Sequence, residues 1–143
     1  MSSRQRVLVV DDFTDAREMY REYLASVGYD VIEAANGVEA VERAIDTSPD
    51  VILMDLSLPL MDGLEATRRL KADRRTTAIP VVAMSGFDLS MVPADASLAG
   101  AVSFVAKPCF PHEVVQAIQR ALSGQIDLPA VSATRGRRRV PSQ

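Results

Sequence analysis

The stretch VILMD at residues 51–55 is a continuous apolar run that ends in a carboxylate. Four apolar residues in a row suit a strand that is buried on both faces, as in a parallel sheet covered by helices. A second run of this kind, VLVV at residues 7–10, leads directly into Asp11 and Asp12. The two runs together indicate an α/β domain in which acidic residues follow the strands.

Apolar runs and amphipathic segments alternate along the rest of the chain. Further strands are predicted at residues 31–34, 79–84 and 101–106. Helices are predicted where apolar residues recur three or four positions apart, at residues 16–27, 38–45, 64–70 and 111–122. A further helix is expected between Phe87 and Gly100, and Pro93 should make it short, displaced or irregular.

This alternation predicts five strand–helix units with right-handed crossovers and a parallel sheet covered on both faces. The 143 residues contain no internal repeat and no second apolar run large enough for another core, so we expect one domain over residues 1–124. Residues 125–143 lack hydrophobic periodicity and are expected to form a flexible basic tail.

The charge of the chain is unevenly distributed. The net charge is −3, but the tail is basic because it holds Arg135, Arg137, Arg138 and Arg139. We expect this tail to be a solubilising segment and binding of nucleic acid to be absent. Electrostatic contact with nucleic acid or an acidic partner is the alternative.

Composition excludes several kinds of site. Cys109 is the only cysteine and His112 the only histidine, so no internal disulfide can form and neither a thiolate zinc site nor a multi-histidine centre is expected. No apolar run reaches the roughly 18 residues that a membrane span needs, and the N-terminus does not have the pattern of a signal peptide. We therefore expect a cytoplasmic protein without membrane contact.

Polar residues come directly after four of the five predicted strands. Asp11 and Asp12 follow the first strand, Asp55 the third, Ser85 the fourth and Lys107 the fifth. In an open parallel sheet the strands end along one edge, and ligands bind there. We therefore expect these five residues to meet in one cleft.

Three carboxylates in one cleft repel one another. A like-charged pair about 4 Å apart costs roughly 4 kcal/mol at an effective dielectric constant of ~20. Mg²⁺ would neutralise them, since it takes carboxylate, water and phosphate oxygens as ligands. A carboxylate with a free oxygen can also attack phosphorus and form an aspartyl-phosphate. Lys107 could then pair with the phosphoryl charge, and the Ser85 hydroxyl could donate a hydrogen bond to it.

The sequence resembles the receiver domains of two-component response regulators. The resemblance covers about residues 5–123 and rests on motifs in the usual order: VVDD at 9–12, Asp55, PLMDG at 59–63, SG at 85–86, Phe104 and KP at 107–108. It implies a flavodoxin-like fold, a doubly wound parallel sheet of strand order 2-1-3-4-5.

The resemblance also implies roles for the residues of the cleft. Asp55 would be the phosphoacceptor, and Lys107 would pair with the phosphoryl group. Asp11, Asp12 and Asp55 would hold Mg²⁺ together with the backbone carbonyl of Ser57.

A conformational switch is implied as well. Ser85 would move toward the phosphoryl group while Phe104 rotates inward, and the Lys107–Pro108 bond would be cis. Ser85 stands where Thr is commoner in the family, and Phe104 stands where Tyr is commoner. Ser85 could instead cap the following helix, and Phe104 could be an ordinary core residue. Pro93 lies in the segment that normally helps to form the output face.

These features predict a stand-alone phosphorylated switch, because the chain ends a tail's length after the fifth predicted helix. The phosphoryl donor would be a histidine kinase or a phosphotransfer protein. A downstream protein would bind the face formed by the fourth predicted helix, the fifth strand and the fifth helix. Activity as an enzyme would be limited to self-catalysed phosphotransfer and autodephosphorylation.

Three alternatives stay open. Mg²⁺-dependent phosphohydrolases also use an aspartate at the end of a strand, but they need a second aspartate two residues later, where this chain has Ser57. A receiver-like interaction module would not be phosphorylated, and the intact Asp55 and Lys107 argue against it. The chain could also be the N-terminal receiver of a larger regulator, because residues 125–143 would look the same in that case.

Overall fold

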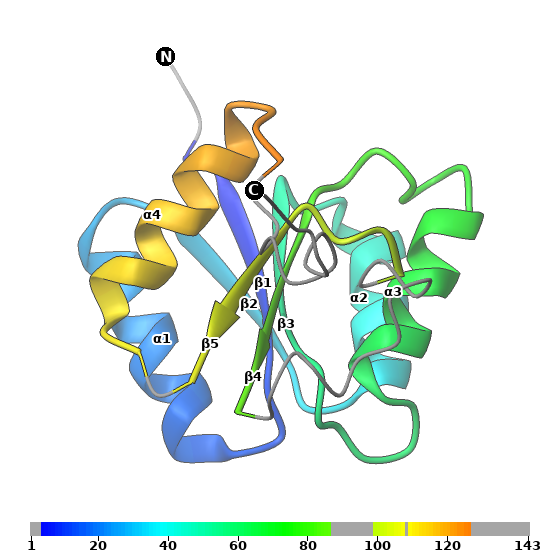
Figure 1. Ribbon diagram of the computed structural model, residues 1–143, viewed down its shortest axis with the longest axis horizontal. Coiled ribbons are helices and arrows are strands. Elements are labelled where there is room, and N and C mark those ends of the chain that lie inside the picture. The colour runs from blue at the N-terminus through cyan, green and yellow to red at the C-terminus, as the bar shows by residue number, and fades with distance from the viewer. Residues whose placement is uncertain (1–3, 87–98, 108, 127–143) are drawn as a thin grey trace, which may run out of the picture.

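A computed structural model describes residues 4–86, 99–107 and 109–126 (Figure 1). Five parallel strands form one sheet of order β2-β1-β3-β4-β5. The strands are β1 (Arg6–Val10), β2 (Asp30–Ala34), β3 (Val51–Asp55), β4 (Val81–Ser85) and β5 (Ser103–Ala106). The predicted α/β class and strand order are confirmed.

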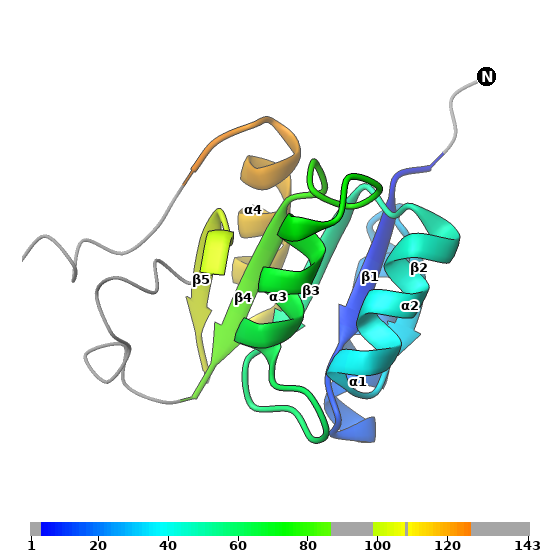
Figure 2. The same ribbon diagram turned by 90° about the vertical axis from the view of Figure 1, so that its right-hand side faces the viewer.

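Four helices are present in the described ranges: α1 (Thr14–Ser26), α2 (Gly37–Thr47), α3 (Gly63–Ala72) and α4 (Pro111–Leu122). Figure 1 shows α1 and α4 on one face of the sheet and α2 and α3 on the other. Figure 2 shows the side of the molecule that α2 and α3 cover. None of these helices is long and apolar enough to cross a membrane.

Two predictions concern residues outside the described ranges. The helix expected between Phe87 and Gly100, with Pro93 in it, falls almost entirely on residues 87–98. The basic tail falls on residues 127–143 apart from its first two residues, Gln125 and Ile126. Helix α4 therefore corresponds to the fifth helix predicted from the sequence, and the division into residues 1–124 and 125–143 stays a prediction.

The core has two halves because neighbouring residues of a strand point to opposite faces of the sheet. Val7, Val9 and Leu53 pack with Leu24 of α1 and Ile118 of α4. On the other face, the buried strand residues that pack with the buried residues of α2 and α3 are Leu8, Val10, Ala34, Ile52, Met54, Val81 and Ala83. Burying one large apolar side chain contributes roughly 1.5–3 kcal/mol, so the two halves together stabilise the alignment of the strands.

The helix faces differ in detail from the simple apolar pattern. Met19 and Val27 share helical spacing with the buried Tyr20 and Leu24, but both are exposed. Val38 of α2 is exposed as well. The buried positions of α2 are instead Gly37, Ala40 and Ala44, and their small size lets this helix lie close to the sheet.

The fourth strand begins two residues later than predicted. Pro80 has no N–H group to donate to a neighbouring strand, and β4 starts at Val81. The Pro80 carbonyl still accepts a hydrogen bond from the Ile52 amide at 3.0 Å, so the chain is already aligned with β3 at this point.

Gly63 lets α3 begin directly against the end of β3. A Cβ atom at this position would overlap the Asp55 carbonyl oxygen and lie 2.7 Å from the Leu56 Cα. Because the obstacle is backbone, the contact cannot be relieved by moving a flexible side chain. The loop that follows Asp55 is therefore held close to α3 by the absence of a side chain at residue 63.

We expect Gly63→Ala to lower the free energy of unfolding by roughly 1–3 kcal/mol, the usual cost of an overpacked site. Urea unfolding followed by circular dichroism would measure this cost. Gly86→Ala is the matched control, because the nearest atom to its added Cβ is the Lys107 Cβ at 4.0 Å. Equal stability of Gly63→Ala and the wild type would contradict the close approach described above.

Candidate functional site

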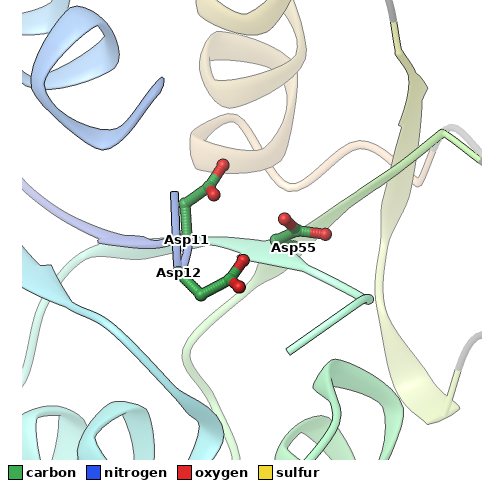
Figure 3. Close-up of side chains that lie close together, drawn as sticks. All are labelled: Asp11, Asp12 and Asp55. Carbon is green, nitrogen blue, oxygen red and sulfur yellow. The ribbon is translucent and has the colours of Figure 1, made fainter. Parts of the chain in front are cut away.

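Three acidic side chains meet where β1 and β3 end. Figure 3 shows Asp11 and Asp12 at the end of β1, with Asp55 of β3 beside them. One carboxylate oxygen from each residue lies within 4.8 Å of the others. Asp11 and Asp55 are buried, with exposed fractions of 1% and 5%, whereas Asp12 is exposed. The predicted convergence of the acids is confirmed.

Lys107 bridges two of these acids. Its Nζ donates to Asp11 Oδ2 and to Asp55 Oδ2, each at 3.2 Å. Lys107 follows β5, so its side chain reaches past β4 to the ends of β3 and β1. Its backbone amide donates to the Ser85 carbonyl at 2.8 Å, which fixes the lysine backbone to the end of β4.

Each of the two buried acids is held by a local turn of the same kind. The Phe13 amide donates to Asp11 Oδ1 at 2.9 Å, and the Ser57 amide donates to Asp55 Oδ1 at 2.9 Å. In each case the carboxylate accepts from the amide two residues later, as aspartate does in an Asx-turn. One oxygen of each acid is thus held by its own loop, and the other faces Lys107.

Burial and neighbouring charge set the protonation of the pair. Burial raises the pKa of Asp55 above its usual value, and the charge of Asp11 adds to this, while the Ser57 amide and Lys107 act in the opposite direction. Burial alone would lower the pKa of Lys107, but the negative charges of Asp55 and Asp11 outweigh burial and raise it. Lys107 therefore stays charged and offsets one of the three carboxylates.

The excess of negative charge makes this cluster suitable for a hard divalent cation. Three carboxylates and one ammonium group leave two negative charges in a space where oxygen atoms predominate. Mg²⁺ prefers oxygen ligands and is commonly held by one or two carboxylates. The donor set of Asp11, Asp12 and Asp55 fits that preference.

The other predicted site residues surround the acids. Ser85 is fully buried at the end of β4, and its carbonyl contacts the Lys107 amide. Ser57 is exposed in the loop directly after β3. Phe104 is half-buried on β5 and packs against the half of the core on the α2–α3 face. Pro108 lies outside the described residues, so the cis form of the Lys107–Pro108 bond stays a prediction.

Two residues near the acids were not identified from the sequence. Arg17 of α1 donates from Nη1 to the Asp11 carbonyl at 2.8 Å. Tyr20 is buried, with its hydroxyl 4.0 Å from the Cys109 sulfur. Burial raises the pKa of this phenol, with smaller contributions from Cys109, Asp11 and Asp55. The helical spacing of Tyr20 indicated a core residue, and nothing in the local sequence indicated that Arg17 turns back toward Asp11.

Comparison with known proteins gives consistent matches. A family model described as the response regulator receiver domain matches residues 7–119. The chain is 39% identical over 120 residues to the chemotaxis protein CheY of Bacillus subtilis, covering 82% of this chain and 98% of that protein. It is 34% identical to the phosphate regulon transcriptional regulatory protein PhoB of Pseudomonas aeruginosa, covering 81% of this chain and 51% of that protein.

A solved structure also matches closely. It is the receiver domain of a sensor histidine kinase from Pseudomonas aeruginosa PAO1, with a magnesium ion coordinated in its active-site cleft. The TM-score is 0.77 at 30% identity, and the match covers 85% of this chain and 99% of that one.

The raised pKa of Asp55 predicts a pH-dependent loss of stability. The folded protein holds the Asp55 proton to higher pH than the unfolded chain, whose carboxyl titrates near 3.8. Stability is therefore lost as the pH rises from that value through the folded pKa. Asp55→Asn removes this loss and keeps an acceptor for the Ser57 amide, so it should unfold at a higher urea concentration near neutral pH without divalent cations.

The advantage of Asp55→Asn should shrink as the pH falls toward about 4. Asp46→Asn is the matched control, because it removes one negative charge from an exposed position of α2. If Asp55→Asn is less stable than the wild type near neutral pH, the raised pKa of Asp55 would be contradicted.

Proposed function

This chain belongs to the response regulator receiver domain family of two-component signalling, and we propose that it is a phosphorylated switch with Asp55 as its phosphoacceptor. The observation that carries the proposal is the position of Lys107, whose ammonium group contacts Asp55 and Asp11 at 3.2 Å each. A buried carboxylate at the end of a strand thus has a cation beside it and two further acids within reach.

The phosphoryl transfer needs no additional protein nucleophile. An oxygen of Asp55 attacks phosphorus, an O–P bond forms, and the bond from phosphorus to the donor breaks with its electron pair leaving on the donor. The Ser57 amide holds one Asp55 oxygen, which fixes the orientation of the carboxylate. Lys107 is placed to pair with the new phosphoryl charge, and the Ser85 hydroxyl to donate to it. The donor would be a histidine kinase or a phosphotransfer protein.

The metal site proposed for this reaction uses Asp11, Asp12, Asp55 and the backbone carbonyl of Ser57. Its support is the cluster of three carboxylates whose oxygens lie within 4.8 Å of one another. When bound, Mg²⁺ would screen the negative charge that an anionic phosphoryl donor otherwise meets at this cluster.

The output of the switch is proposed to be protein binding at a face formed by β5 (Ser103–Ala106) and α4 (Pro111–Leu122). The fourth predicted helix, which was expected to belong to the same face, falls almost entirely outside the residues that the structure describes. Phe104 borders a groove of about 400 Å³ in this face, which is also lined by Cys109, Glu113 and Arg120. Phe104 of β5 is in register with Ala83 of β4, and Ser85 lies two residues further along β4, in register with Ala106. A shift of Ser85 toward a phosphoryl group could therefore be coupled to rotation of Phe104 and to a change in the groove.

The proposal assigns no turnover of an external substrate beyond self-catalysed phosphotransfer and autodephosphorylation, and it places the protein in the cytoplasm. Receiver domains also occur within larger proteins, as the half coverage of PhoB illustrates. The chemistry proposed for Asp55 is the same for a separate receiver and for one joined to an output domain.

Phosphorylation can be tested by intact-mass spectrometry after incubation with Mg²⁺ and acetyl phosphate. We expect one added phosphoryl group in the wild type and none in Asp55→Asn. No adduct should form when EDTA chelates the metal before acetyl phosphate is added. A folded wild-type protein that gains no mass and does not bind beryllofluoride would contradict the proposal and favour a non-phosphorylated interaction module.

Mg²⁺ should also stabilise the folded protein before any phosphorylation. A ligand that binds only the folded state adds about 1.4 kcal/mol at roughly ten times its Kd. Thermal unfolding with and without MgCl₂ should show this gain in the wild type and little or none in Asp12→Asn. Asp15→Asn is the matched control, since it removes a nearby exposed acid outside the cluster. An equal gain in Asp12→Asn and the wild type would contradict the proposed metal site.

A further inference from the structure

The two acids at the end of β1 are joined by a single peptide unit. The Asp11 carbonyl and the Asp12 amide lie in one plane, because the peptide bond does not rotate freely. The orientation of this plane therefore affects the directions in which both side chains leave the backbone. Any group that holds the Asp11 carbonyl will influence the two acids together.

Arg17 is the group that holds this carbonyl. Its Nη1 donates to the Asp11 oxygen at 2.8 Å, and its Nε donates to Glu33 Oε1 at 3.0 Å. The Arg17 side chain is only 17% exposed, so both contacts are shielded from water compared with an ordinary surface ion pair. The guanidinium group presents its donors in a fixed plane, so one side chain fixes two acceptors relative to each other.

Glu33 ties this arrangement to the sheet. It lies on β2, in register with Val9 of β1, two residues before Asp11. Its second oxygen accepts from Arg21 Nη1 at 3.2 Å, so successive turns of α1 contact the two oxygens of one carboxylate. Arg21 shares the Glu33 contact with Arg17, but no hydrogen bond joins it to Asp11 in the described structure.

We propose that Arg17 is a positioning residue that sets the peptide plane between Asp11 and Asp12 and thereby the affinity of the acid cluster for Mg²⁺. This inference rests on the proposed function, because it assumes that the cluster binds the metal. The inference gives α1 and β2 a part in metal binding, because the Arg17–Glu33 contact ties both elements to the loop that carries the two acids.

The proposal predicts an effect opposite in sign to simple electrostatics. Removing a positive charge beside an anionic cluster should strengthen cation binding if only coulombic interactions matter. If Arg17 positions the acids, Arg17→Gln should instead weaken Mg²⁺ binding. Replacing a residue that orients a metal ligand typically weakens the affinity for the metal by about 10–100-fold.

The test compares Arg17→Gln, Arg17→Lys and Arg21→Gln by NMR titration with MgCl₂. We expect about a tenfold weaker affinity or worse for both Arg17 variants and a change within about twofold for Arg21→Gln. Arg17→Lys keeps the charge but loses the planar fork, so it separates geometry from charge. Arg21→Gln is the matched control, because it removes the same charge and the same Glu33 partner without an Asp11 contact.

A second measurement does not need the metal. The Phe13 amide is held by Asp11 Oδ1, so its hydrogen exchange reports on the order of the acid loop. Exchange at Phe13 in the metal-free protein should accelerate in Arg17→Gln and not in Arg21→Gln, while circular dichroism confirms that both variants are folded.

The outcomes separate the inference from the function on which it rests. Equal effects of Arg17→Gln and Arg21→Gln, or tighter Mg²⁺ binding by Arg17→Gln, would overturn the positioning role. If the wild type binds no Mg²⁺, the proposed metal site fails, and the link from Arg17 to metal affinity fails with it. Phe13 exchange would still decide in that case whether Arg17 orders the loop.

Discussion

The ammonium group of Lys107 contacts both Asp11 and Asp55, and it thereby joins the polar residues at the ends of β1, β3 and β5, along one edge of the sheet. We call these residues the polar edge. The two contacts can form only if β1, β3 and β5 run in the same direction and end at the same level. The order β2-β1-β3-β4-β5 meets this requirement, and β4 lies between the lysine and the acids that it contacts. The two apolar half-cores on either face of the sheet keep the strands in that alignment.

One oxygen of each buried acid is held by a local turn, and the other contacts the distant Lys107 side chain. Each buried acid is first oriented by the amide two residues later, which costs little chain entropy because the contact is local. The facing oxygens then share one cation, which offsets only part of their charge. The negative charge that Lys107 does not neutralise destabilises the metal-free protein somewhat. The same uncompensated charge makes the cluster attractive to a divalent cation. Strained or charged sites of this kind are usually functional, and the surrounding core stabilises them.

Strong local sequence patterns were sufficient to predict the strands and the meeting of the three acids, whereas the strand order came from the resemblance to receiver domains. Continuous apolar runs marked β1 and β3, and the residues directly after them supplied the acids. The pattern was weaker for helix faces: Met19 and Val38 have the right character for a core but point outward. Arg17 could not be found in this way, because its contact with Glu33 depends on the register of β2 against β1 and on the rotation of α1. The switch role proposed for Phe104 would require two states of the protein, and the same sequence pattern is compatible with a switch residue and with an ordinary core residue.

The distance along the chain between Asp11 and Lys107 has a consequence for biosynthesis. Their contact spans 96 positions, so almost the whole domain must be synthesised before the lysine becomes available. Until then the acids at the ends of β1 and β3 lack their cation, and any early pairing of these strands brings like charges together. Contacts between distant parts of a chain also form late for entropic reasons. A partly synthesised or truncated chain that ends before β5 would therefore carry a repulsive acid cluster, so the polar edge becomes stable only when the domain is complete.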